Sequence, residues 1–300
     1  MSRHAYLIMA HHNFLQLFRL LKFLDSPCVD IFLHVDKNAK TFEQKKTQQV
    51  CTRAKLTIIH RKSLAWGGDS LTKCEVAMLK AALPGKYDYY HLISGEDVPL
   101  LPIKAIHGFF DENKGKEFVS VNWNASDKPN SDIYNRIRYY NWFQNYVGRG
   151  ASGYKRILWE LQLILKNIQK RCGVDRCKKL SWRLGKGSQW FSITHEFAQY
   201  MVSYYESNLK RAFAFSYGTD ELLVQTSLIN NPSFLAQQYK DGNMRLIDWE
   251  RSVDGCSPYT FTSEDYDMMM DSGKIWARKV SETVDNEVID KIYQAIDSNN

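Results

Sequence analysis

The sequence predicts an α/β protein with a mostly parallel sheet flanked by helices, and three observations support this. In the first part of the chain, apolar runs of strand length alternate with segments that are apolar at helical spacing, as in β-α-β units. The runs are apolar almost throughout, which is typical of strands that helices cover on both faces. Polar residues follow directly where several runs end, which is where parallel sheets bind ligands.

The individual strands and helices follow from these patterns in chain order. Five strands are predicted at residues 5–10, 30–35, 55–60, 89–94 and 118–122. Helices are predicted at residues 14–24 and 71–83. Further along, strands are predicted at residues 189–193 and 244–249, and helices at residues 195–207, 221–230 and 263–271.

The composition is that of an ordinary globular protein, with 44% apolar and 24% charged residues. No apolar run approaches the roughly 18 residues that a membrane-spanning helix needs, and residues 4–10 are predicted as a strand rather than a secretory signal. The six cysteines are scattered, and the closest two, Cys172 and Cys177, have no matching second pair. We therefore expect free thiols and a cytoplasmic protein.

Basic residues are concentrated in the middle of the chain, whose net charge is +7. Residues 136–186 contain thirteen Lys or Arg but only two acidic residues, Glu160 and Asp175. A nucleic acid, an anionic membrane surface or a phosphorylated substrate would each account for such a segment. We expect one domain over residues 1–300, made of an α/β half (1–123), a basic helical insert (124–186) and a second half (187–300).

Acidic residues follow two of the predicted strands. Asp36 can accept hydrogen bonds from a uracil N3–H or from ribose hydroxyls, although a turn-forming or helix-capping Asp is as common at such a position. Glu96 and Asp97 come after Gly95, which lets the backbone approach a ligand. Adjacent side chains of an extended segment point apart, so one carboxylate facing the ligand is expected rather than a metal held by both.

Several histidines in the first part of the chain are also compatible with a metal-dependent hydrolase, which is a minor alternative. The residues concerned are His11, His12, His34, His60 and His91, together with Asp97. No two of these histidines form an i, i+4 pair on a helix. His34 and His91 lie inside predicted strands, where a hydrogen-bonded core histidine is the commoner outcome, whereas His11 stands at the expected ligand-binding edge.

A loop is predicted to enter a helix at residues 218–225. Thr219 or Asp220 would cap this helix, and Glu221 would stand in its first turn. A carboxylate in that position either complements the helix dipole or acts as a general base on an acceptor hydroxyl.

Cations near the end of the chain offer a way to bind a diphosphate. Arg278 and Lys279 are adjacent and can neutralise a departing nucleotide without a metal. No Asp-x-Asp triplet follows any of the first five strands, which agrees with a metal-free site. Trp190 and Trp249 can stack on sugar faces, although most buried aromatic residues fill cores.

Taken together, these segments resemble the core-2/I-branching β-1,6-N-acetylglucosaminyltransferases, the family that also includes peptide O-xylosyltransferases. The matching stretches, in order, are HAYLIMAHHN, IFLHVDK, LAWGGDSLTKCEVAMLKAAL, YDYYHLISGEDVPL, KGSQWFSIT, YGTDELLVQT and IWARKV. They span residues 4–280 in the family's order. We expect the chain to be similar to a bacterial-type member, without the cysteine pattern, anchor and stem of the animal Golgi enzymes.

The resemblance implies a glycosyltransferase-A-like fold with a Rossmann-like, mostly parallel sheet. It implies an inverting glycosyltransferase of glycan biosynthesis that moves a sugar from a UDP donor to a glycan hydroxyl, with no metal or other cofactor. N-acetylglucosamine is the expected sugar and xylose the alternative. In this scheme residues 1–123 bind the nucleotide sugar, and residues 187–300 bind the acceptor and supply the catalytic group. The rival from another class is a basic nucleic-acid-binding protein, for which no recognised motif is present, so nucleic acid is not an expected partner.

The resemblance also assigns roles to single residues. Glu221 matches the catalytic base, in a motif where Thr219 replaces the family's proline. The expected donor-binding residues are His11, Asp36 on the uracil, Asp97 on the sugar side and Lys279 on the diphosphate, with Arg251 and Arg278 as candidates for a second cation. The expected acceptor-binding residues are Trp190, Asp220 and Trp249.

The basic insert contains a predicted amphipathic helix at residues 154–171. Its apolar stripe consists of Ile157, Leu161, Ile164, Leu165 and Ile168. Its basic residues are Lys155, Arg156, Lys166, Lys170 and Arg171. Such a helix can lie on an anionic membrane, where a lipid-linked acceptor would be met, and the enzyme would then be peripheral on the inner membrane face. The alternative, which is the commoner fate of such helices, is that the stripe covers the protein's own core.

Overall fold

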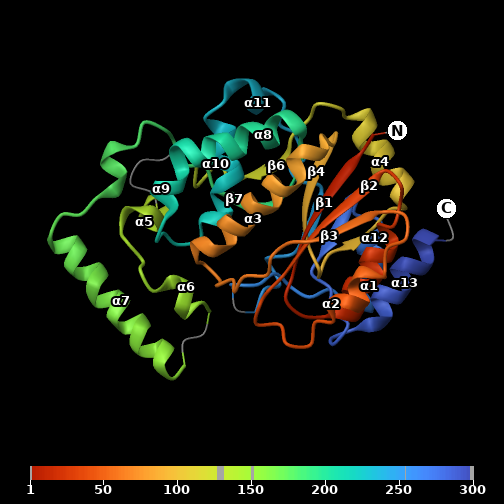
Figure 1. The fold of residues 1–300 in the computed structure, drawn as a ribbon, viewed down its shortest axis with the longest axis horizontal. Coiled ribbons are helices and arrows are strands. Elements are labelled where there is room, and N and C mark those ends of the chain that lie inside the picture. Colours follow the sequence, from red (N-terminus) through yellow and green to blue (C-terminus); the bar gives the residue numbers. More distant parts are fainter. Residues whose placement is uncertain (1, 127–131, 150–151, 254, 298–300) are drawn as a thin grey trace. The chain divides into compact units, whose positions relative to one another are not determined.

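Four apolar runs form parallel strands in the computed structural model of the chain (Figure 1). The structure describes residues 2–126, 132–149, 152–253 and 255–297. The strands lie in the order β3 (Lys55–Ile58), β2 (Val29–Val35), β1 (His4–Ala10) and β4 (Tyr89–Ser94). Every residue of β1 and β4 is buried, as expected for central strands of a covered parallel sheet. The predicted α/β fold class is confirmed.

The chain forms two compact units, and their segments alternate along the sequence. Unit 1 comprises Met1–His60, Tyr87–Gly115 and Asn243–Asn300, and unit 2 comprises Arg61–Lys86 and Lys116–Gly242. The subdivision at residues 123 and 186 that we expected from the sequence stays a prediction.

Unit 1 contains the parallel strands and a second, smaller sheet. In that sheet, β9 (Trp276–Arg278) pairs antiparallel with β5 (Val98–Pro99) and parallel with β8 (Arg245–Ile247). The helices of this unit are α1 (Phe14–Phe23), α2 (Gln44–Gln48), α4 (Ile103–Glu112), α12 (Tyr266–Met270) and α13 (Asn286–Asp297). An ion pair of 2.6 Å between Arg19 and Asp290 joins α1 to α13.

Unit 2 contains most of the helices and one antiparallel strand pair. The helices are α3 (Asp69–Ala82), α5 (Asp132–Arg138), α6 (Gln144–Val147), α7 (Tyr154–Arg171), α8 (His195–Tyr204), α9 (Lys210–Phe213), α10 (Leu223–Ile229) and α11 (Pro232–Ala236). The strands are β6 (Phe118–Val121) and β7 (Gly187–Thr194). The fifth predicted strand is thus present as β6, but it pairs antiparallel with β7. An apolar run in the sequence indicates a buried strand, but it does not indicate whether the neighbouring strand is parallel or antiparallel.

The described helices include none that is long and apolar enough to cross a membrane. The helix predicted at residues 263–271 begins as a 3-10 turn, Ser263–Asp265, before α12. The helix predicted at residues 195–207 ends as α8 at Tyr204 and continues as a wider π-helical turn, Tyr205–Leu209.

Candidate active site

In unit 1, the parallel register brings together polar residues from three strand ends. Ala10, the last residue of β1, is paired with Val35 of β2, and Met9 is paired with Ser94 of β4. The backbone N–H groups of Asp36 and Gly95 donate to the carbonyls of β1, each at 2.9 Å. The segments that begin at His11, Asp36 and Gly95 therefore leave the sheet at one edge, as the sequence predicts.

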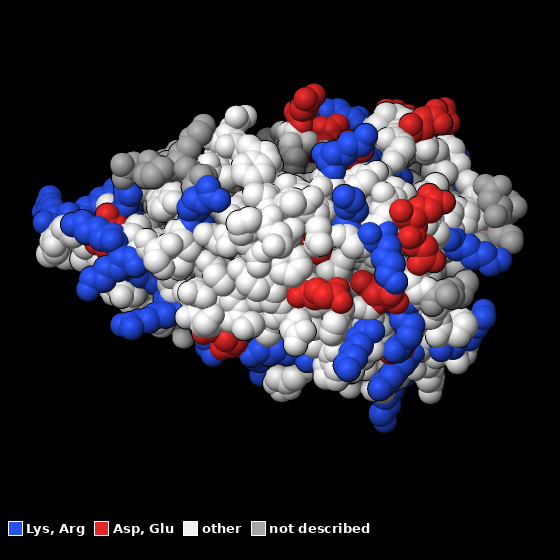
Figure 2. Space-filling model, turned by 90° about the horizontal axis from the view of Figure 1, so that it is seen from above, with Lys and Arg blue, Asp and Glu red and all other residues white. Residues whose placement is uncertain are grey.

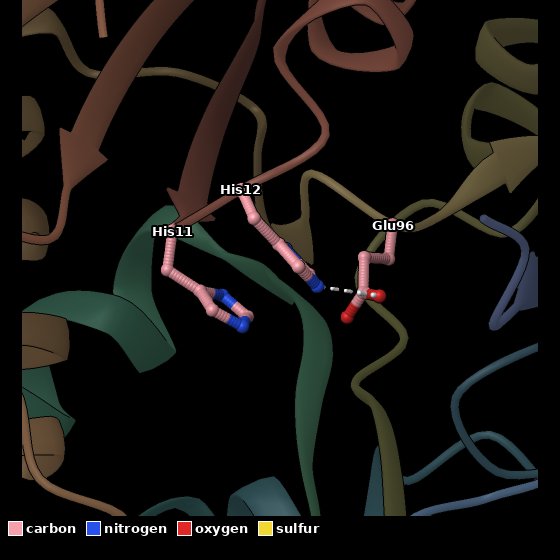
Figure 3. Close-up of side chains that lie close together, drawn as sticks. All are labelled: His11, His12 and Glu96. Atoms are coloured by element: carbon pink, nitrogen blue, oxygen red, sulfur yellow. Dashed lines mark ion pairs between the residues drawn. The ribbon is translucent and has the colours of Figure 1, made fainter. Parts of the chain in front are cut away.

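His11, His12 and Glu96 form a cluster at this edge (Figure 3). The two imidazole rings stack with centroids 4.0 Å apart, and Nε2 of His12 lies 3.4 Å from Oε1 of Glu96. Within the described parts of the chain, these three side chains are the group close enough to hold a metal ion, with ligand atoms within 4.8 Å of one another. The other histidines considered from the sequence, and Asp97, are not members of it.

Electrostatics show which other residues lie near His11. Desolvation by the surrounding protein lowers the pKa of His11, and the adjacent His12 lowers it further. Glu96 and Asp36 act in the opposite direction on this pKa, and Lys279 lowers it. His11 is thus within electrostatic reach of two other predicted donor-binding residues, Asp36 and Lys279.

Asp36 takes part in the turn that follows β2. Its Oδ1 accepts a hydrogen bond of 2.7 Å from the backbone N–H of Asn38, so the turn-forming role that the sequence left open is observed. Contact of Asp36 with a uracil ring stays a prediction.

Asp97 is fully buried and forms an ion-pair network with two arginines. Its carboxylate is 3.7 Å from Nε of Arg278 and 4.0 Å from Nε of Arg245, and it accepts from the backbone N–H of Ser94. Burial raises the pKa of Asp97, while Arg278 and Arg245 oppose that change. Glu96 faces His12 instead, so the two adjacent carboxylates diverge as predicted.

Arg245 is a residue of the site region that the sequence analysis missed. Its side chain is fully buried and donates to the carbonyls of Leu92, at 2.8 Å, and Asn243, at 3.0 Å. Burial lowers the pKa of Arg245 to about 10. In the sequence, the one sign of this buried residue is that a charged side chain directly precedes the apolar pair Leu246-Ile247.

The other predicted residues of unit 1 lie near its surface. Arg251 is held by Asp248, at 2.6 Å, and by Asp265, at 2.7 Å, and its guanidinium stacks on Tyr259. Trp249 is 53% exposed, which suits a residue that stacks on a sugar. Of the two arginine candidates for diphosphate binding, Arg251 is engaged by two carboxylates and Arg278 by Asp97.

In unit 2, Glu221 ends a 3-10 turn rather than opening a helix. The turn is Thr219–Glu221, and α10 begins only at Leu223. The prediction that Thr219 or Asp220 caps the helix was wrong: neither side chain makes a cap bond, and the Thr219 hydroxyl bonds that of Thr72 at 2.7 Å. Gly218 allows the turn because its φ of 58° is left-handed.

Arg136 orients the Glu221 carboxylate. Its Nη1 donates to Oε2 of Glu221 at 2.8 Å and to the carbonyl of Gly218 at 3.0 Å. A Cβ at Gly218 would lie only 2.7 Å from that Nη1, so the close approach requires glycine there. The Glu221 side chain is 38% exposed, which leaves it accessible to a substrate.

Asp220 differs from its neighbour because it is buried. Burial, and then the charge of Glu221, raise the pKa of Asp220 to about 7. Burial, and then Asp220, also raise the pKa of Glu75 well above its usual value. Burial therefore shifts Asp220 and Glu75 toward the protonated form, whereas Glu221 is the most exposed carboxyl group of the three. Trp190, in β7, is half-buried.

Unit 2 contains a cavity of about 400 Å³. Arg136, which donates to Gly218 and Glu221, also lines this cavity. The cavity is lined by Asn135, Arg136, Asn141, Gln144, Trp159, Gln162, Leu163, Lys166 and Tyr217. Amides, cations and aromatic rings are a set that can bind the hydroxyls and faces of sugars. The sequence did not reveal this cavity because its lining comes from four separate segments.

The predicted site residues are divided between the two units. Unit 1 holds His11, Asp36, Asp97, Trp249, Arg251, Arg278 and Lys279. Unit 2 holds Trp190, Asp220 and Glu221.

Comparison with known proteins adds an independent finding. A family model described as Core-2/I-Branching enzyme matches residues 4–270. Xylosyltransferase 2 of Rattus norvegicus is 24% identical over 96% of this chain and 33% of its own length. Xylosyltransferase sqv-6 of Caenorhabditis briggsae is 26% identical over 93% of this chain and 35% of its own length. The chain thus spans about a third of the length of these curated relatives.

Among solved structures, the apo form of mouse xyloside xylosyltransferase 1 is similar to this chain. The identity is 10%, and the match covers 92% of this chain and 97% of the mouse chain, with a TM-score of 0.39.

Proposed function

Because the chain belongs to the Core-2/I-branching enzyme family, we propose that it is an inverting glycosyltransferase that moves a sugar from a UDP donor to a hydroxyl of a glycan. The observation that carries this proposal is the accessible Glu221 carboxylate, held by Arg136 at 2.8 Å. It stands where the resemblance places the catalytic base, and Arg136 also lines a cavity suited to a sugar.

In the proposed reaction, Glu221 takes the proton of an acceptor hydroxyl as that oxygen attacks the anomeric carbon. Attack opposite the UDP inverts the anomeric centre. The bond from that carbon to the diphosphate oxygen breaks, and the electron pair leaves with UDP. Lys279, together with the guanidinium of Arg278, neutralises the departing diphosphate.

We propose that the transfer needs no metal or other cofactor, since these cations can supply the charge. The alternative ligand set is the cluster of His11, His12 and Glu96. Asp97 is a poor candidate for a metal ligand because it is enclosed with two arginines.

For the donor we propose UDP-N-acetylglucosamine, with UDP-xylose as a second candidate. The second candidate is favoured by relatives that are named xylosyltransferases. For the acceptor we propose a lipid-linked glycan, met at the cytoplasmic face of a membrane. Salt-sensitive binding to random DNA, with no affinity for UDP, would instead favour a nucleic-acid-binding protein.

Lys279→Ala should weaken binding of UDP roughly tenfold or more and change binding of uridine little. A charge-assisted contact to the diphosphate contributes about 1.5–3 kcal/mol, and uridine lacks that group. Calorimetric titrations with UDP and uridine in excess EDTA measure both affinities. Lys104→Ala, which removes an exposed lysine of α4 in the same unit, is the matched control.

Transfer itself should survive EDTA in the wild type. If Lys279→Ala weakens binding of UDP and binding of uridine equally, Lys279 does not contact the diphosphate. A strict manganese requirement would make His11, His12 and Glu96 the metal ligands.

A further inference from the structure

Helix α7 exposes an apolar stripe along its length. The stripe, called here the α7 stripe, consists of residues three or four positions apart: Tyr154, Ile157, Leu161, Ile164 and Ile168. Their exposed fractions lie between 39% and 69%. Leu165, which the sequence placed in the stripe, is half-buried instead. Scattered exposed apolar residues are normal, but a contiguous row of this length marks an interaction surface.

Two buried glutamines attach α7 to the rest of unit 2 by hydrogen bonds. Gln162 and Gln169 are the buried residues of the helix. Gln162 accepts from the backbone N–H of Phe143 at 3.0 Å and donates to Oε1 of Gln144 at 3.2 Å. Gln169 accepts from the N–H of Tyr140 at 2.8 Å and donates to its carbonyl at 3.0 Å. Within the described residues, the stripe therefore does not cover the protein's own core.

The charge on α7 indicates what kind of partner covers the stripe. The helix carries Lys155, Arg156, Lys166, Lys170 and Arg171, and one acidic residue, Glu160. Glu160 is already paired with Arg156 at 3.2 Å. In Figure 2, Lys and Arg side chains gather on the left, the side on which the C-terminal part of α7 lies in Figure 1. A second copy of the helix would bring like charges together, whereas an anionic surface complements them.

We propose that α7 docks the enzyme on an anionic membrane. The α7 stripe enters the boundary between headgroups and acyl chains, and Lys155, Arg156, Lys170 and Arg171 meet lipid phosphates. Two exposed aromatic residues near the helix, Trp142 and Tyr146, are of the kind that lies at membrane interfaces. This docking does not depend on the proposed transferase activity.

Another face of α7 connects docking to the acceptor, a step that rests on the proposed function. Trp159, Gln162, Leu163 and Lys166 of this helix line the cavity that also contains Arg136. A helix lying on the membrane holds that cavity near the lipid surface. A glycan carried on a lipid is then an acceptor that can reach it without leaving the bilayer.

Vesicle co-sedimentation of the full chain tests the docking, with no sugar donor present. The protein should pellet with vesicles of phosphatidylcholine and phosphatidylglycerol at low salt, and much less with phosphatidylcholine alone or at high salt. The triple variant Lys155→Gln, Lys170→Gln, Arg171→Gln should reduce the pelleted fraction severalfold. The double variant Ile157→Ser, Ile164→Ser should do the same while keeping all the basic residues.

The matched control is the triple variant Lys22→Gln, Lys45→Gln, Lys104→Gln. It changes three exposed lysines of unit 1 and lowers the net charge by the same amount. It should pellet like the wild type. Equal loss in the control, or a wild type that ignores anionic vesicles at low salt, would overturn the proposal.

Size-exclusion chromatography tests whether a second copy of the chain covers the α7 stripe instead. The wild type should elute at the same volume as the Ile157→Ser, Ile164→Ser variant, as the same oligomeric species. A larger species that this variant abolishes would show that a second copy covers the stripe, and membrane docking would be overturned. Because none of these readouts uses UDP, failure of docking and failure of sugar transfer remain distinguishable.

Discussion

Glu221→Gln should lower the rate of sugar transfer by at least roughly 100-fold, the lower end for loss of a positioned general base. The amide has nearly the shape of the carboxylate and can still accept from Arg136, so the turn is kept while the base is removed. UDP affinity should be nearly unchanged, because the predicted donor-binding residues lie in unit 1. Transfer rates with saturating donor, and a UDP titration, measure the two effects.

Glu196→Gln is the matched control for this substitution. Glu196 is an exposed carboxylate of unit 2 in the first turn of α8, where it complements the helix dipole. The transfer rate of this variant should stay within about twofold of the wild-type rate, since substitutions at exposed positions of this kind have small effects on stability. Near-normal turnover in Glu221→Gln would move the catalytic role to another residue.

Asp97→Asn should destabilise the fold by about 3–5 kcal/mol, the range for breaking a buried ion pair by removing one partner. The substitution leaves the buried guanidiniums of Arg245 and Arg278 without the carboxylate that lies 3.7–4.0 Å from each. Urea denaturation followed by circular dichroism measures the free energy of unfolding. Glu287→Gln, which breaks an exposed pair with Lys291 on α13, should cost less than about 0.5 kcal/mol.

A double variant separates the ion-pair network from a general packing effect. Asp97→Asn combined with Arg245→Met removes one of the two positive charges together with the negative one. The combined loss of stability should be smaller than the sum of the two single losses, because the residues share one network. Strict additivity would contradict the account of Asp97 as the counter-charge of these arginines.

Much of the fold could be predicted because parallel strands leave a strong pattern. The strand predicted at residues 5–10 is β1, His4–Ala10, and the helix predicted at residues 154–171 is α7 with the same bounds. Parallel register also explains why residues that directly follow β1, β2 and β4 were correctly expected at one edge.

The missed features depend on contacts between distant segments. Arg136 meets Glu221 across 85 residues of sequence, and no local pattern shows that pairing. The start of α10 was placed too early because a 3-10 turn and a helix share the same residue preferences at Glu221. For α7, periodicity showed the helix but not its orientation, because the amides of Gln162 and Gln169 occupy the inward face.

The most direct test of the central claim is a donor screen in EDTA that measures UDP released from UDP-N-acetylglucosamine, UDP-xylose, UDP-galactose and UDP-glucose. Simple methyl glycosides serve as acceptors, and Glu221→Gln is run beside the wild type. We predict UDP release by the wild type from UDP-N-acetylglucosamine, or from UDP-xylose as the second candidate, and roughly 100-fold less by the variant. Release from none of the four donors, or equal release by wild type and variant, would contradict the claim.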